Sequence, residues 1–449
     1  MENKIEYIFN LFNLIYGIGN EKLEIHYGVD HESRIQIQQG STGYFNQKKV
    51  YNFNNVVWRE WKGIKIPFLF DESDRSDFYT IKENKIIINY DIIASSFFFL
   101  SGWHEYVNMS TDDLGRFPYK ESIQYKLDVV DKPIVNYYFD ILKTAIEKAY
   151  NTRLHVKLWG DFDFATCITH DIDKCRSAWL EGSFRELLKG RILIPVKLIS
   201  KRLFQEDAWF NFEEILNIEK KYDVHSSFYF LSRKGRESGF KNADYDINNK
   251  KLRNVIRKIL DNNSEIGIHG SFGTHTSLEK FMHDMEKLNF DIIGNRFHFL
   301  NFDITITPNI LEQANIKYDT SLGFSEHFGF RNSFCLPFYL YDIENDRPTK
   351  VLEIPLNLMD VTLAYSKYMN LKSDEVMPKV EELIKEIRKF NGCFTFLWHN
   401  NLFSEYKFSG WKEVFIRLLE YCKREKSLFA SGREIYSRYD ENFSIGRNK

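Results

Sequence analysis

The chain has few cysteines, and none of them shows a pairing or zinc-type spacing. Among 449 residues there are five, at Cys167, Cys175, Cys335, Cys393 and Cys422, and no two form a Cys-x-x-Cys pair. An odd number without close spacing fits a disulfide framework poorly. We therefore expect a reduced, intracellular protein.

Long apolar runs are also missing. The segment "IIASSFFFLSGW" at residues 92–103 is shorter than the ~18 uncharged apolar residues that span a bilayer, so we expect it to be buried in the protein. The start of the chain, "MENKIEYIFNLFNLIYGIG", lacks the basic segment and the small-residue cleavage site of a signal peptide. Together these absences predict a soluble, cytoplasmic protein without stable membrane insertion.

Neither sign of charge is in excess. Lys and Arg total 61 and Asp and Glu 63, which gives a formal net charge of −2. Nucleic-acid binding would need a basic face, so this balance argues against a nucleic-acid partner. With only nine prolines and no Ser/Gly-rich stretch, the chain also has no obvious flexible linker. The hydrophobic fraction of 43% is enough for a globular core.

Two regions of the chain differ in their pattern of predicted strands and helices. Up to about residue 155, short strand-like pieces such as "NNVVWREW" and "GIKIPFLF" mix with helical segments. Ile134, Tyr138, Ile141 and Ala145 recur at helical spacing and predict a helix that closes this region. We expect a smaller α+β domain at 1–155 and a second domain at 156–449.

The second region alternates short apolar runs with amphipathic helices. Predicted strands include "FATCITHD", "SSFYFLS", "EIGIH", "VLEIPLNLMD" and "CFTFLWHN". Predicted helices include "FEEILNIEKKY", "LRNVIRKIL", "SLEKFMHDMEKL" with Ser277 as N-cap, and "KVEELIKEIRKF". Such alternation indicates parallel βα units, which form either a barrel or a doubly wound sheet.

Polar side chains stand where several of these strands end. Asp171 and Asp173 follow one strand, and His269, Asp360 and His399 each end another. A (β/α) barrel builds its site from residues at the carboxyl ends of different strands. The distribution therefore favours an α/β fold of the barrel type.

Residues 160 to 435 resemble the polysaccharide deacetylases with a NodB-homology domain (carbohydrate esterase family 4). The likeness rests on five short motifs in the family's order: "THDID", "EIGIHGSFGTH", "GNRFHF", "KYDTSLGF" and "FLWHN". The resemblance implies a distorted (β/α) barrel. The preceding region, with "IIASSFFFLSGWHEY" and "GRF", resembles a leader domain found ahead of such domains.

The resemblance also implies roles for individual residues. Asp173 would bind a divalent metal, and Asp171 would be the base that takes the proton of water. His399 would protonate the leaving group, and Arg296 would pair with Asp171 and keep it ionised. A mixed Asp/His site suits Zn²⁺, with Co²⁺, Fe²⁺ or Ni²⁺ as alternatives.

The chain departs from the family at the third metal ligand. The family places two histidines four residues apart, but the residue four after His269 is Gly273. His275 lies six residues after His269, and His298 follows a neighbouring strand. We expect one of these two histidines to complete the site, unless the site is inactive.

Each of these residues also has a structural explanation. Asp171 and Asp173 could cap the segment that follows them, His399 could be packed beside Trp398, and Arg296 could form a surface ion pair. For His170, which stands where the family has an aromatic residue, we expect a structural role.

Two functions remain open. The first is a metal-dependent hydrolase that removes N- or O-acetyl groups from a sugar or polysaccharide precursor in surface polysaccharide metabolism. The second is a non-catalytic, deacetylase-like protein that binds glycans or acts as a scaffold, which the glycine at position 273 favours. A glycoside hydrolase fits less well, because Asp171 and Asp173 are too close in sequence to flank a sugar ring without a third acid such as Asp360.

Overall fold

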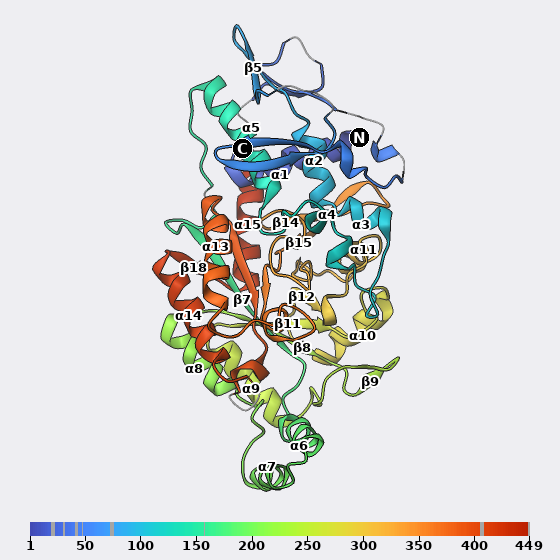
Figure 1. Cartoon of the computed structure of the whole chain (residues 1–449), viewed down its shortest axis with the longest axis vertical. Coiled ribbons are helices and arrows are strands. Elements are labelled where there is room, and N and C mark those ends of the chain that lie inside the picture. Colours follow the sequence, from blue (N-terminus) through green and yellow to red (C-terminus); the bar gives the residue numbers. More distant parts are fainter. Residues whose placement is uncertain are drawn as a thin grey trace.

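The protein has a mixed α/β architecture. The computed structural model describes residues 1–18, 23–29, 32–40, 44–46, 48–71, 76–156, 158–404 and 408–447. Figure 1 shows the N-terminal region at one end of the molecule, a large sheet with its covering helices in the middle, and a pair of helices at the other end. None of the helices in these ranges combines the length and apolar character needed to cross a bilayer.

The N-terminal region is built from a small sheet, a hairpin and several helices. In the sheet the strands lie in the order β1-β2-β6-β5, and β3 pairs with β4 in the antiparallel hairpin. The strands are β1 (Ile25–Tyr27), β2 (Ile35–Ile37), β3 (Val57–Trp61), β4 (Ile64–Phe68), β5 (Tyr79–Lys82) and β6 (Lys85–Ile88). The helices are α1 (Glu2–Tyr16), α2 (Ile92–Leu100), α3 (Trp103–Asn108), α4 (Ile123–Lys126) and α5 (Ile134–Tyr150).

The apolar segment after residue 91 forms helix α2, and all its residues are buried. A helix that is apolar on every side must be covered on every side. Helices α1 and α5 both contact α2, and Asp91 caps its first turn by accepting a hydrogen bond from the backbone N–H of Ala94 at 2.8 Å. The prediction that this segment is buried in the protein is therefore confirmed.

A ten-stranded, mostly parallel sheet forms the centre of the second region, counted over the described residues. Its order is β14-β15-β13-β12-β11-β8-β7-β17-β16, with β18 also pairing with β7, and only β14 runs antiparallel to its neighbour. The strands are β7 (Phe164–Ile172), β8 (Ser227–Leu231), β11 (Glu265–Gly270), β12 (Gly294–Phe297), β13 (Tyr318–Asp319), β14 (Phe338–Asp342), β15 (Arg347–Glu353), β16 (Leu358–Met359), β17 (Cys393–Leu397) and β18 (Ser427–Phe429).

Helices alternate with these strands along the chain, as the sequence predicts. They are α6 (Ala178–Leu188), α7 (Leu193–Phe204), α8 (Phe212–Tyr222), α9 (Lys250–Asp261), α10 (Leu278–Leu288), α11 (Thr307–Gln313), α12 (Asp360–Ala364), α13 (Val376–Lys389), α14 (Trp411–Arg424) and α15 (Gly432–Arg447). Two short strands, β9 (Arg236–Glu237) and β10 (Phe240–Lys241), form a separate hairpin. The side chain of Ser277 caps α10, also as predicted.

The segment "VLEIPLNLMD", predicted as one strand, is divided between β15 and β16. These strands lie far apart in the sheet order, yet only residues 354–357 separate them in the chain. Four residues span at most about 15 Å, so the sheet must curl until its two ends approach each other. Within this link, Asn357 exchanges hydrogen bonds with Thr395 of β17. The sheet is thus a curled, incomplete barrel, which agrees with the α/β class predicted from the sequence.

The N-terminal region and the curled sheet share one hydrophobic core among the described residues. A buried ion pair also joins them, since Glu105 of α3 accepts two hydrogen bonds from Arg331, at 2.9 and 2.7 Å. Gln124 of α4 donates to the backbone carbonyl of Arg331 at 2.6 Å. The domain boundary at residue 155 stays a prediction, and the packing across it is continuous.

Candidate metal centre

Neighbouring strands bring the first group of polar side chains together. Asp171 is near the end of β7, His269 lies near the end of β11, and Arg296 lies in β12. His269 and Arg296 are direct partners across the β11–β12 pair, and β8 lies between β7 and β11. Since these strands are parallel, their carboxyl ends meet at one edge of the sheet, where Asp173 follows β7.

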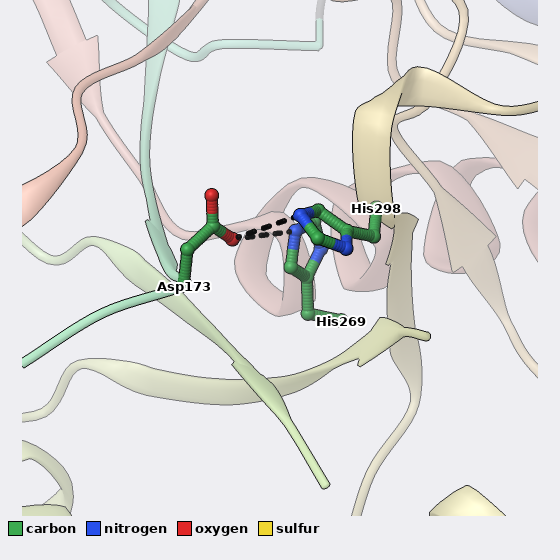
Figure 2. Close-up of side chains that lie close together, drawn as sticks. All are labelled: Asp173, His269 and His298. Carbon is green, nitrogen blue, oxygen red and sulfur yellow. Dashed lines mark ion pairs between the residues drawn. The ribbon is translucent and has the colours of Figure 1, made fainter. Parts of the chain in front are cut away.

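Asp173, His269 and His298 form the one group of three potential metal ligands found among the described residues. Their ligand atoms all lie within 4.8 Å of one another. Oδ1 of Asp173 is 3.2 Å from Nε2 of His269 and 3.6 Å from Nε2 of His298 (Figure 2). Figure 2 shows both imidazole rings directed at the same carboxylate oxygen.

The hydrogen bonds of this group fit a bound divalent cation. Nδ1 of His269 lies 2.8 Å from the backbone carbonyl of Arg296, which can only accept, so Nδ1 carries a proton. In the neutral ring, Nε2 then presents a lone pair to Oδ1 of Asp173, and two acceptors face each other. Oδ1 of Asp173 is buried and has no hydrogen-bond donor within the described residues. A cation between these atoms would satisfy both, and a carboxylate with two imidazoles is a donor set that Zn²⁺ binds.

The same contacts shift the acidity of the three side chains. Burial works to raise the pKa of Asp173, but the imidazoles of His298 and His269 outweigh it and hold the pKa well below its usual range. For His269, burial is outweighed by the carboxylates of Asp171 and Asp173, which raise the pKa. For His298, burial prevails and lowers the pKa. Asp173 therefore favours its ionised form, the form in which a carboxylate binds a metal.

Asp171 and Arg296 form an ion pair next to this group. Nη1 of Arg296 is 3.3 Å from Oδ1 of Asp171, and the other oxygen of Asp171 is 3.6 Å from Nε2 of His269. The guanidinium is completely buried and also donates to Thr169 at 2.7 Å and to Thr320 at 2.8 and 2.9 Å. Arg296 is therefore not a surface residue, and its hydrogen bonds fix the position of the Asp171 carboxylate.

His399 lies near the second carboxylate oxygen of Asp173. Its Nε2 lies 3.9 Å from Oδ2 of Asp173, the oxygen that does not face the two ligand-type histidines. Nδ1 of His399 is 2.7 Å from Oδ1 of Asp360, whose Oδ2 accepts the backbone N–H of His399 at 2.5 Å. Burial alone would lower the pKa of His399, but Asp360 first and then Asp173 raise it to about 9.

The pairing of Asp360 with His399 was not predicted from the sequence. Strands β16 and β17 are parallel neighbours, with Met359 opposite Leu397, so the residues just beyond the two strand ends come together. The signal was present, because both residues end predicted strands. Only the strand order shows that these strands are adjacent.

Two other histidines have different environments. His275 is not part of the three-residue group: its ring lies edge-on to Phe297, with ring centres 6.2 Å apart, and its backbone carbonyl accepts a hydrogen bond from Thr307. His170 is buried, with Nδ1 2.6 Å from the carbonyl of Trp398 and Nε2 2.8 Å from Glu219. These two hydrogen bonds agree with the structural role predicted for His170.

The N-terminal region contributes a side chain beside the centre. Arg116, from the "GRF" segment, donates to Asp112 at 2.7 and 2.9 Å and reaches the carbonyl of Phe299 at 3.5 Å. Phe299 follows His298 and stacks on its ring, with centres 3.8 Å apart. Arg116 is thus two contacts away from a candidate metal ligand, a relationship between the two regions that the sequence did not indicate.

Comparisons with known proteins give partial matches. A family described as "Family of unknown function (DUF7033)" matches residues 2–151. No curated protein sequence matches the chain significantly. Among solved structures, a protein from Mycobacterium smegmatis described as a polysaccharide deacetylase is similar at 14% identity and a TM-score of 0.43, over 63% of this chain and 92% of its own.

Two further solved structures resemble the chain over the same shares, 63% of this chain and 92% of theirs. The Puue allantoinase is 13% identical with a TM-score of 0.42. A Pseudomonas aeruginosa PAO1 protein described as a polysaccharide deacetylase is 12% identical with a TM-score of 0.42.

Proposed function

We propose that the chain is a metal-dependent hydrolase that removes an N- or O-acetyl group from a sugar or polysaccharide precursor. The observation that carries this proposal is that two sets of side chains lie close to the carboxylate of Asp173. One is the set of potential metal ligands with His269 and His298, and the other is the His399–Asp360 pair.

The side chains divide the proton transfers of an amide or ester hydrolysis between them. Asp171 is an acceptor-only carboxylate next to His269, and Arg296 holds it in place, so it can take a proton from an attacking water. His399 lies near the other carboxylate oxygen of Asp173 and carries a proton for the leaving amine or alcohol. Asp360 orients the ring of His399 through Nδ1 and leaves Nε2 free to donate that proton.

Asp173, His269 and His298 would hold the metal. When bound, a divalent ion such as Zn²⁺ supplies a water of lowered pKa and polarises the acetyl carbonyl. Arg296 connects the two halves of this arrangement, because its carbonyl holds His269 while its guanidinium holds Asp171. Co²⁺, Fe²⁺ and Ni²⁺ are alternatives that the same ligands can bind.

A non-catalytic, glycan-binding protein is the second candidate. The observation in its favour is Gly273, which has a positive φ of 79° and stands where the resemblance calls for a ligand histidine. His298 weakens this alternative, since its ring approaches Asp173 from the turn that directly follows β12, the strand next to that of His269.

Acetate release and metal content, measured on the same purified protein, separate the two candidates. With saturating Zn²⁺ or Co²⁺, the enzyme should release acetate from at least one member of a panel of N- and O-acetylated sugars. Asp171→Asn should bind metal and release none. A wild type that binds glycans but releases no acetate from any substrate, with each of the four metals, supports the non-catalytic candidate.

A further inference from the structure

Helices α6 and α7 carry a large apolar surface that the rest of the described protein leaves uncovered. More than half of the exposed large hydrophobic residues of the described chain lie between residues 180 and 204. Six of them are each at least 63% exposed: Phe184, Leu188, Ile192, Leu193, Leu203 and Phe204. An apolar patch of this kind marks a surface that contacts a membrane or another protein.

The two helices stand apart from the body of the molecule. They pack against each other, and none of the apolar side chains at 179–204 belongs to the main hydrophobic core. Figure 1 shows them together at the end of the molecule opposite to the N-terminal region. Their exposed residues are therefore available to an external surface rather than to the sheet.

The base of the α6–α7 pair is held firmly. Asp207 accepts hydrogen bonds from the backbone N–H groups of Ala178 and Trp209, at 3.2 and 3.0 Å. It therefore joins the start of α6 to the segment that follows α7. Asn400 donates to the carbonyls of Lys174 and Trp209, at 2.9 and 2.6 Å. The pair thus projects in a defined direction from the carboxyl end of β7, the sheet edge that carries Asp173.

The charges that follow residue 186, from the end of α6 through α7, all have one sign. From residue 187 to residue 205 the chain contains Lys189, Arg191, Lys197, Lys201 and Arg202 and no acidic residue. Glu186, just before this stretch, pairs with Lys189 and Arg191 at 3.0 and 3.2 Å. Exposed apolar side chains interspersed with basic ones match the surface of an anionic bilayer, where the apolar groups enter the interface and the cations meet lipid phosphates.

We propose that the α6–α7 pair binds the surface of an anionic phospholipid bilayer. The apolar residues at 180–204 lie in the interface without spanning it, and the basic residues at 189–202 contact the headgroups. This attachment is independent of whether the metal centre is catalytic. It places the sheet edge that carries Asp173 on the side of the molecule from which the membrane-bound helices project.

Sedimentation with vesicles tests the proposal. Wild-type protein should pellet with phosphatidylcholine vesicles that contain about one third phosphatidylglycerol, and much less with pure phosphatidylcholine. High salt should weaken the anionic component of binding. Leu193→Asp and Phe204→Asp should each lower the partition coefficient by about tenfold or more, because a charge then replaces a buried apolar side chain. Lys197→Glu should weaken binding only to the anionic vesicles.

Leu260→Asp on α9 is the matched control, because Leu260 is also exposed on a basic helix but lies outside the α6–α7 pair. Its partition should equal that of the wild type. A polarity-sensitive fluorophore on Ser200→Cys should shift to the blue on anionic vesicles, while the same label on Ser437→Cys should not. Labelling is selective because all five native cysteines are buried.

Several outcomes would overturn the proposal. Wild-type protein that stays in the supernatant, equal binding to neutral and anionic vesicles, or equal loss in Leu260→Asp and Leu193→Asp would each contradict it. So would a lipid-free dimer that Leu193→Asp and Phe204→Asp dissociate, since the apolar surface would then belong to a contact between two copies of the chain.

Discussion

Both carboxylate oxygens of Asp360 contact His399, one at its ring Nδ1 at 2.7 Å and the other at its backbone N–H at 2.5 Å. The hydrogen bond at Nδ1 orients the ring, and Nε2 then lies 3.9 Å from Oδ2 of Asp173. Asp173 therefore stands between a histidine pair suited to bind a metal and a histidine suited to carry a proton.

Removing the negative charge of Asp360 should make His399 hold its proton less tightly. Asp360→Asn keeps the size of the side chain but lowers the pKa of His399, so we expect acetate release to fall by about 10²-fold with bound metal unchanged. The double variant Asp360→Asn/His399→Ala should be no slower than His399→Ala alone, because the two residues act as one unit. Additive losses in steady-state kinetics would mean that Asp360 acts elsewhere.

The two neighbouring carboxylates should respond differently to the same substitution. Asp173→Asn removes a charged ligand-type oxygen, so we expect loss of both metal and acetate release. Asp171→Asn leaves the group of Asp173, His269 and His298 intact and should lose acetate release alone. Metal analysis by plasma mass spectrometry, run beside the activity assay, makes the comparison. Equal metal loss in the two variants would count against separate roles.

The third metal ligand should be His298. His298→Ala removes a ring that lies 3.6 Å from Asp173, so we expect zinc content to fall by about 10-fold or more at limiting Zn²⁺. His275→Ala is the matched control, as the same residue type close by but outside the group, and should keep its zinc. Zinc loss in His275→Ala with retention in His298→Ala would reverse the assignment.

The buried ion pair between Glu105 and Arg331 should be needed for stability. Glu105→Gln leaves the guanidinium buried without its countercharge, so we expect the free energy of unfolding to fall by about 3–5 kcal/mol in urea titrations. Residues 156–449 expressed alone should be poorly folded, because removing residues 1–155 exposes the hydrophobic core that the two regions share. Glu382→Gln, in an exposed ion pair, should leave the unfolding midpoint unchanged. A stable, monomeric 156–449 fragment would show instead that the second region folds independently.

The stability of the N-terminal region should depend on the protonation of Asp71. Burial raises the pKa of Asp71 to about 7, and the carboxylate of Asp91 adds to this, while the N–H of Asp91 and the charge of Arg59 oppose it. The pKa of Asp71 in the folded protein exceeds its unfolded value of about 3.9. The stabilisation contributed by the protonated Asp71 side chain is therefore complete below about pH 4 and is lost as the pH rises through 7.

Asp71→Asn removes this titration. The free energy of unfolding of the variant minus that of the wild type should therefore be about 2–3 kcal/mol larger at pH 8 than at pH 5. Denaturant titrations at the two pH values measure the difference. Asp113→Asn, at an exposed aspartate, should show no such change between pH 5 and pH 8.

Local features of this protein follow from its sequence because they depend on neighbouring residues. Apolar periodicity identified α8, α9 and α10, Ser277 marked the start of α10, and the uniformly apolar segment at 92–100 indicated a buried element. The alternation of strands and helices predicted parallel βα units, which placed Asp171, His269 and His399 at strand ends. Those ends share one edge of the sheet, so the group could be expected before its geometry was known.

Only the tertiary structure decided which of these side chains meet. The approach of His298, rather than His275, to Asp173 depends on β12 lying next to β11, and the pairing of Asp360 with His399 depends on β16 lying next to β17. Arg296 could not be recognised as buried from its type, because its burial requires Thr169 in β7 and Thr320, just after β13, to accept its hydrogen bonds. The sequence specifies local conformation through short-range periodicity, whereas contacts between distant residues arise from the strand order and from the curl of the sheet.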